Sequence, residues 1–220
     1  MRILLSLLIT LTCQPVLAQS TSPIVEKYPA TKPGAGFTFV DGAFLVKCNH
    51  WKVIDRNTGG LIVSTCGDYT MYVTAENGNP VRTLNARHET VAQFVPYYPD
   101  TSFPLFVGKK WTGKYNGQEG SFIKWSGELD CAATAFEPVQ VAAGKYDAYR
   151  IECSDRWDAG IIFMHGIKKS TRWYAPSVNM IIKSVNADSK WNYELAGIDQ
   201  AVTLNLFRNH RTGVPITGNF

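Results

Sequence analysis

The sequence predicts an all-β protein, either a curved antiparallel sheet or an open or half β-barrel, with at most one or two short helices. From Phe37 onward the chain is a series of short runs of aromatic and β-branched residues, which are typical of strands. Turns rich in glycine, asparagine and proline separate these runs, as in antiparallel sheets. Hydrophobic residues make up 45% of the 220 residues and charged residues 18%, which excludes a disordered or collagen-like chain.

The first 18 residues have the pattern of a secretory signal peptide. Arg2 supplies the positive region, Ile3 to Leu11 the apolar region, and Val16-Leu17-Ala18 a cleavage site before Gln19. The apolar stretch is about ten residues long, whereas a membrane-spanning helix needs about 20, and no later segment comes close. We therefore expect no transmembrane span, and a bacterial protein exported by a Sec-type signal to the periplasm or beyond.

Beyond the leader, we expect an irregular N-terminal arm over residues 19–36 and a single β-rich domain over residues 37–220. The arm is rich in proline, glycine, serine and threonine and shows no periodicity. The expected strands cover residues 44–54, 61–66, 70–75, 81–84, 110–115, 120–125, 137–141, 146–153, 168–174, 180–187 and 202–207.

Two local patterns in the middle of the chain give more specific predictions. The apolar residues Ala86, Val91 and Phe94 stand among polar neighbours and predict a short helix over residues 85–95. Asn116-Gly117 predicts a hairpin turn between two strands, because both residues readily adopt the positive φ that tight hairpins require.

Four cysteines remain after the leader and predict disulfide bonds in an oxidising compartment. They allow three connectivities. The midpoint of Cys48 and Cys66 falls in the turn at residues 55–60, and the midpoint of Cys131 and Cys153 falls in the turn at residues 142–145. Facing positions of a hairpin bring Cβ atoms to disulfide distance, which favours these two pairs and leaves the other connectivities open.

An aromatic segment between the two halves of the chain is the candidate ligand-binding region. It combines three prolines with five aromatic residues, Phe94, Tyr97, Tyr98, Phe103 and Phe106. A loop this apolar indicates a ligand mouth or an interface, because large exposed apolar patches are uncommon on soluble proteins. The alternative is that the loop plugs an open end of the barrel.

The sequence shows no recognisable catalytic, cofactor or metal site. The four histidines do not stand at metal-ligand spacing, and motifs for nucleophilic serine, phosphate and calcium are absent. Asp155, Asp158 and His165 around Arg156-Trp157 could bind an ion or a polar ligand, although a solvated loop explains them without such a role. The formal net charge of the chain is only +4, and the basic residues are scattered along the sequence, which argues against nucleic-acid binding.

Three segments carry a resemblance to a known group of proteins. They are Phe103 to Trp111, Glu137 to Ile151, and Trp173 to Val178, preceded by the Asp55-x-x-Thr58-Gly59 turn. Their order resembles uncharacterised bacterial periplasmic proteins of the DUF3108-like group, which are similar in turn to open β-barrel carriers of the lipoprotein-localisation type. The resemblance implies a β-barrel-like fold and no catalytic residue. Ala143 and the four cysteines depart from the pattern.

The sequence therefore predicts a non-enzymatic exported protein that binds an apolar or amphipathic ligand, such as a lipid, in the concavity of a curved sheet. Two alternatives stay open. One is a cell-envelope interaction or assembly factor that docks through a sheet edge or the arm. The other is a hydrolase whose site the sequence does not reveal.

Overall fold

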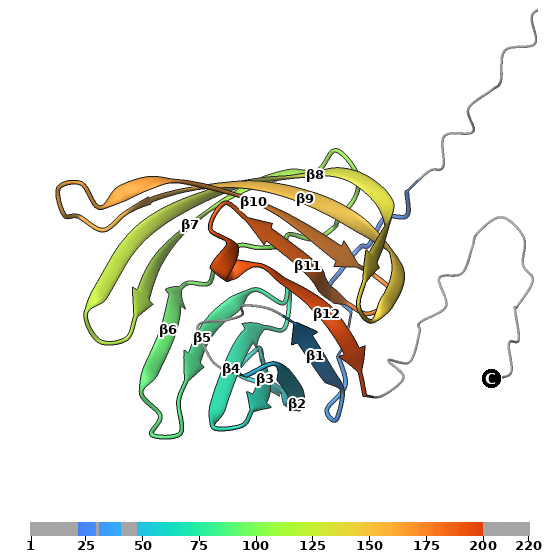
Figure 1. The fold of residues 1–220 in the computed structure, drawn as a ribbon, viewed down its shortest axis with the longest axis horizontal. Coiled ribbons are helices and arrows are strands. Elements are labelled where there is room, and N and C mark those ends of the chain that lie inside the picture. Colours follow the sequence, from blue (N-terminus) through green and yellow to red (C-terminus); the bar gives the residue numbers. More distant parts are fainter. Residues whose placement is uncertain (1–21, 30, 41–47, 200–220) are drawn as a thin grey trace, which may run out of the picture.

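The structure is a computed structural model that describes residues 22–29, 31–40 and 48–199 (Figure 1). The expected leader and the expected strand at 202–207 lie outside the described residues. Twelve strands and one short 3-10 helix are described, in the order β1 (Gly36–Val40), β2 (His50–Thr58), β3 (Leu61–Cys66), β4 (Tyr69–Thr74), β5 (Pro80–Leu84), β6 (Thr90–Val95), β7 (Lys110–Glu119), β8 (Ile123–Val141), β9 (Gly144–Asp158), β10 (His165–Ala175), β11 (Met180–Asn186), η1 (Ser189–Trp191) and β12 (Tyr193–Ile198).

The strands form one closed antiparallel barrel. Each strand pairs with its neighbour in sequence, and β1 closes the barrel by pairing with β12. The all-β prediction is confirmed, and the barrel is closed rather than open. Closure leaves no free edge among the described strands, since each is hydrogen-bonded on both sides. No helix in the described part of the chain is long and apolar enough to cross a membrane.

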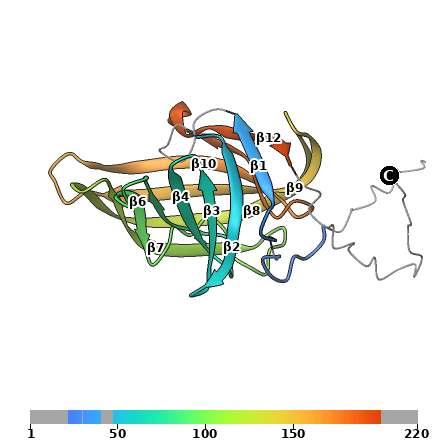
Figure 2. The same cartoon turned by 90° about the horizontal axis from the view of Figure 1, so that it is seen from below.

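The strands β7 to β10 are much longer than the others and shape the molecule. In β8, burial alternates through Gly127, Leu129, Cys131 and Ala133, so every second side chain points inward. The turns at residues 120–122 and 159–164 lie at the same end of the barrel and extend beyond the rest of that end, as both views show (Figures 1 and 2). We call this the hairpin end, and the opposite end the closed end.

The closed end is covered by the N-terminal arm and by the connection between β6 and β7. Val25 of the arm pairs with Leu105 of the connection, and both side chains are buried. Tyr28 packs edge-on against Phe103, whose ring also contacts Tyr174 of β10. These contacts belong to a hydrophobic cluster that includes Leu129 and Ile151 of the β8–β9 ladder. The described part of the arm is irregular apart from this bridge, and it packs onto the barrel.

Both expected disulfides are present. Cys131 and Cys153 face each other across β8 and β9, with their Cα atoms 4.2 Å apart. Cys48 precedes β2 and joins Cys66 at the end of β3, at a Cα separation of 5.9 Å. The hairpin at residues 142–145 is also confirmed, because β8 ends at Val141 and β9 begins at Gly144.

Two local predictions are wrong. The helix expected over residues 85–95 is a turn followed by strand β6, in which Ala92 and Phe94 alternate toward the interior with a spacing of two. The hairpin turn expected at Asn116-Gly117 lies instead at residues 120–122, and Asn116-Gly117 are inside β7. Tertiary packing overrides the local pattern in both cases, because Phe94 lines the interior of the barrel and the ring of Trp125 packs over Gly117.

Candidate functional site

The barrel encloses a cavity of about 380 Å³ near the hairpin end. We call it the lumen cavity. It is lined by residues from nine strands, β4 to β12, and from the connection between β6 and β7. Its apolar lining includes Met71, Ala92, Phe94, Ile123, Trp125, Trp157 and Met164, and its polar lining includes Tyr98, Asp100, Tyr115, Asp155, Lys168, Ser170, Arg172, Ser184 and Tyr193.

Four aromatic rings form one wall of the lumen cavity. The ring of Phe94 lies 5.2 Å from that of Tyr98, 5.8 Å from that of Tyr115 and 6.3 Å from that of Trp125, between centroids. Tyr98 and Tyr115 meet edge-on at 4.9 Å. Such tilted and edge-on pairs are favourable arrangements of aromatic quadrupoles, so the four rings stabilise one another.

Glycines on the facing strand make room for two of these rings. Tyr115 of β7 lies opposite Gly127 of β8, and Trp125 of β8 lies opposite Gly117 of β7. A Cβ atom on Gly127 would come within 2.3 Å of the Tyr115 ring, and one on Gly117 within 2.2 Å of the Trp125 ring. Gly117 therefore belongs in the strand because it accommodates a ring, which is why Asn116-Gly117 does not form a turn.

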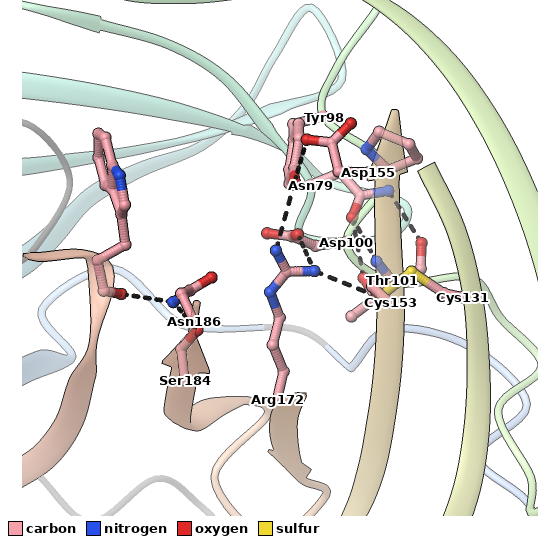
Figure 3. Close-up of polar contacts among 12 residues, drawn as sticks. Asn79, Tyr98, Asp100, Thr101, Cys131, Cys153, Asp155, Arg172, Ser184 and Asn186 are labelled. Atoms are coloured by element: carbon pink, nitrogen blue, oxygen red, sulfur yellow. Dashed lines mark hydrogen bonds and ion pairs between the residues drawn. A yellow bond between two sulfur atoms is a disulfide. The ribbon is translucent and has the colours of Figure 1, made fainter. Parts of the chain in front are cut away.

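A polar centre lies at the base of the lumen cavity, toward the closed end, and consists of Tyr98, Asp100, Asp155 and Arg172 (Figure 3). Arg172 of β10 forms an ion pair with Asp100 at 2.9 Å and donates a hydrogen bond to the Tyr98 hydroxyl at 3.4 Å. Its guanidinium also contacts Sγ of Cys153 at 3.4 Å. Burial lowers the pKa of Arg172, but Asp100 and Tyr98 outweigh this, so the guanidinium stays charged.

Asp155 accepts hydrogen bonds through one carboxylate oxygen and leaves the other without a hydrogen bond from the described residues. Its Oδ2 accepts hydrogen bonds from the hydroxyls of Tyr115 at 2.8 Å and Tyr98 at 3.1 Å. Its Oδ1 is buried and accepts no hydrogen bond from the described residues. Burial raises the pKa of this carboxyl, whereas the two tyrosine hydroxyls and the cations Arg172 and Lys168 act in the opposite direction. Asp155 lines the lumen cavity, but Oδ1 has almost no exposed surface, so a ligand reaches this oxygen only if a neighbouring side chain moves.

The connection between β6 and β7 holds the polar centre in place. Asn79, in the turn between β4 and β5, donates a hydrogen bond to the Thr101 carbonyl and accepts one from the Thr101 amide, each at 2.9 Å (Figure 3). Trp111 donates to the Pro99 carbonyl at 3.0 Å. Asp100 lies between these anchors, which hold its carboxylate beside Arg172 of β10.

The structure separates the five aromatic residues that the sequence assigns to ligand binding. Phe94 and Tyr98 line the lumen cavity. Phe103 packs into the hydrophobic cluster at the closed end. Tyr97 is half-buried and Phe106 is exposed, and neither lines the lumen cavity. Ligand binding by these five residues stays a prediction.

Sequence reasoning missed most of the cavity wall. Of the three polar residues that the sequence groups together here, only Asp155 lines the lumen cavity; Asp158 and His165 pair across β9 and β10 as exposed residues. Alternation in β9 carried the relevant signal, because Asp155 and Trp157 share the inward face with Cys153. The partners of Asp155 lie 40 and 57 residues away along the chain, beyond the reach of a local pattern.

Comparison with known proteins identifies a shared fold. No family model matches the chain, and no curated protein matches it by sequence. Among solved structures, the hypothetical lipoprotein YmcC of Escherichia coli superposes with a TM-score of 0.51 at 9% identity, over 77% of this chain and 88% of YmcC. The chain is thus similar to YmcC in fold alone, and the resemblance to the DUF3108-like group stays an expectation.

Two further solved structures are more distant. A candidate exported protein with a YmcC-like fold from Bacteroides fragilis has a TM-score of 0.46 at 12% identity, over 80% of this chain and 100% of its own. A candidate lipoprotein from Parabacteroides distasonis has a TM-score of 0.45 at 10% identity, over 79% of this chain and 98% of its own.

Proposed function

We propose that this chain is an exported binding protein that holds an amphipathic ligand in the lumen cavity. The observation that carries the proposal is the cavity itself, which has a wall of aromatic and aliphatic side chains around a buried polar centre. Ligand sites typically combine a mainly apolar enclosure with a few fixed polar groups. The leader pattern and the two disulfides support export to an oxidising compartment.

The arrangement of the lining supports an amphipathic ligand rather than a purely apolar one. Phe94, Trp125 and Trp157 offer contact surface for a hydrocarbon portion nearer the hairpin end. The polar lining deeper in the barrel, which includes Asp155, Ser170 and Arg172, offers hydrogen-bonding partners for a polar head group.

Native mass spectrometry of the exported chain, followed by denaturing analysis of the same sample, tests the proposal directly. We expect a bound mass that is released on denaturation and that has both an apolar and a hydrogen-bond-donating portion. A dansyl-labelled fatty acid provides a second test, because its fluorescence rises when it enters an apolar cavity. A chain that carries no extra mass and does not bind the dye contradicts the proposal.

A matched pair of variants assigns the bound dye to the lumen cavity. Ser170→Phe places a ring in the cavity from β10, and Ser126→Phe places the same ring on the exposed face of β8. We expect Ser170→Phe to weaken dye binding roughly tenfold or more, because the ring occupies the ligand's volume. Ser126→Phe should bind the dye as the unmodified chain does.

A further inference from the structure

The tips of the two long hairpins carry exposed apolar side chains that the fold does not use. Phe122, at the turn between β7 and β8, is 94% exposed. In the turn between β9 and β10, Phe163 is 90% exposed and Ile162 is 79% exposed. Ile161 and Ile167 are also largely exposed. These residues stand on two neighbouring hairpins, β7–β8 and β9–β10, and we call them together the tip surface.

Phe163 in particular is not explained by folding. Its φ is +73°, in the left-handed region, which is rare for bulky side chains and favours glycine. The turn is closed by the Met164 amide, which donates to the Ile161 carbonyl at 2.9 Å, and by the Ala159 amide, which donates to the Met164 carbonyl at 2.9 Å. A glycine would satisfy this turn better, so the aromatic ring at this position points to a role outside the fold.

The tip surface is continuous with the mouth of the lumen cavity. Ile123 follows Phe122, and Ala159 and Met164 flank the other tip; all three line the cavity. The tips also extend beyond the rest of the hairpin end (Figures 1 and 2). Lys124 follows Phe122 along β8 and is exposed, with Glu119 and Asp158 as nearby carboxylates, whereas Lys168 lines the lumen cavity with its ammonium 5.0 Å from the centroid of the Trp157 ring. Apolar tips with an adjacent lysine match the interface of a bilayer, where apolar side chains insert and an ammonium stays among the headgroups.

We propose that the tip surface docks on a lipid bilayer, with Phe122, Ile162 and Phe163 inserted into the interface. The occupant is the bilayer surface itself, and docking sets the mouth of the lumen cavity against it. This inference goes beyond the proposed function, because a chain can dock with an empty cavity and can bind a soluble ligand without docking. Backbone hydrogen bonds of the Ala159 and Met164 amides close the tip between β9 and β10, so the side chains of Ile162 and Phe163 are presented outward on a defined turn.

Flotation of the exported chain with vesicles of phosphatidylethanolamine and phosphatidylglycerol tests the proposal. We expect the chain to float with the vesicles, and the double variant Ile162→Ser, Phe163→Gly to lower its partition coefficient roughly tenfold or more, since interfacial binding scales with buried apolar area. Ile54→Ser is the matched control, because Ile54 of β2 is 52% exposed but lies away from the tips. This control should float as the unmodified chain does.

Phe163→Gly alone separates docking from stability. Because glycine suits the positive φ at this position, this variant should unfold at the same or a higher temperature than the unmodified chain while floating less. A chain that does not float, or tip variants that float as well as the control, overturns the proposal. The proposal is also overturned if the unmodified chain binds a soluble envelope protein but no vesicles, and the tip variants no longer bind that protein. This outcome would assign the tips to a protein partner.

The outcomes also separate docking from ligand binding. Ser170→Phe should weaken dye binding and retain flotation, whereas the tip variants should retain dye binding in the absence of vesicles. If Ser170→Phe binds dye normally but the tip variants stop floating, the cavity proposal fails and the docking proposal stands.

Discussion

Arg172 connects parts of the chain that are far apart in sequence. Its guanidinium contacts Asp100 and Tyr98 of the connection between β6 and β7 and the sulfur of Cys153 in β9. Only 8% of its side chain is exposed, so the charge is stabilised by protein partners rather than by water. A buried ion pair contributes little net stability compared with apolar residues, but removing one partner leaves an uncompensated charge.

Replacing Arg172 by methionine should therefore be strongly destabilising. We expect Arg172→Met to lower the free energy of unfolding by about 3–5 kcal/mol, because Asp100 is left buried without its cation. The double variant Asp100→Asn, Arg172→Met should recover much of this loss. Urea unfolding of the three chains measures both effects. A single variant as stable as the double variant would show that Asp100 does not depend on Arg172.

Asp155 gives the chain a pH dependence of known sign. Burial raises the pKa of this carboxyl above its ordinary value of 3.8, so the folded state holds the proton to higher pH than the unfolded state. The group then favours folding at low pH, and this contribution is lost as the pH rises through the raised pKa. Asp155→Asn removes the titrating group and retains an oxygen that accepts from Tyr98 or Tyr115.

The free energy of unfolding of Asp155→Asn, minus that of the unmodified chain, should increase as the pH rises above 3.8, the ordinary pKa of the carboxyl. Urea unfolding of both chains at a series of pH values measures it, and taking the difference removes most of the contribution of Asp100, whose pKa is also raised by burial. A difference that stays constant with pH, or that shrinks as the pH rises, contradicts the raised pKa of Asp155.

At the scale of the element, β7 and β8 show how facing glycine and aromatic residues build a cavity wall. The arrangement recurs in the next hairpin, where Gly166 of β10 faces Trp157 of β9. The fit differs, because a Cβ atom on Gly166 would lie 3.4 Å from the nearest atom of Trp157, whereas one on Gly127 would lie 2.3 Å from Tyr115. Alanine thus fits against Trp157 and collides with Tyr115.

Gly127→Ala should lower the free energy of unfolding by about 1–3 kcal/mol, which is typical when a packed site receives an extra methyl group. Gly166→Ala should be neutral or slightly stabilising, since alanine loses less backbone entropy than glycine in a strand. Thermal unfolding of both variants tests this pair. Equal effects would mean that backbone entropy, and not contact with the ring, decides the outcome.

Sequence reasoning predicted the features of these elements that depend on neighbouring residues. Alternation and turn residues located β3 and the turn at residues 142–145, and hairpin symmetry gave both disulfides. The sequence wrongly predicted a helix at residues 85–95 and a turn at Asn116-Gly117. The first segment is a turn followed by β6 and the second lies inside β7, because packing against residues distant in the sequence outweighs the local preference. In the second case the partner is Trp125, whose ring covers Gly117, and only the register of β7 on β8 reveals it.

At the scale of the whole molecule, the barrel is not equally well paired around its circumference. β8 and β9 pair continuously from Ser126 and Asp158 to Val141 and Gly144, apart from one bulge. By contrast, β11 and β12 pair only at Lys183–Ser184 with Tyr193–Glu194. Ser184 and Tyr193 of this short ladder line the lumen cavity. The shortest ladder of the barrel is therefore also part of the wall of the candidate site.

This unevenness predicts a gradient of local stability, which amide hydrogen exchange measures. Local opening requires less free energy where fewer ladder hydrogen bonds must break, so amides of β11 and β12 should exchange faster than those of the β8–β9 ladder. A ligand in the lumen cavity contacts both sides of the short ladder and should slow exchange there selectively, since binding to the closed state raises the cost of opening. Exchange that is uniform around the barrel, or protection by dye that appears only in β8 and β9, would show that the short ladder is not where the barrel opens.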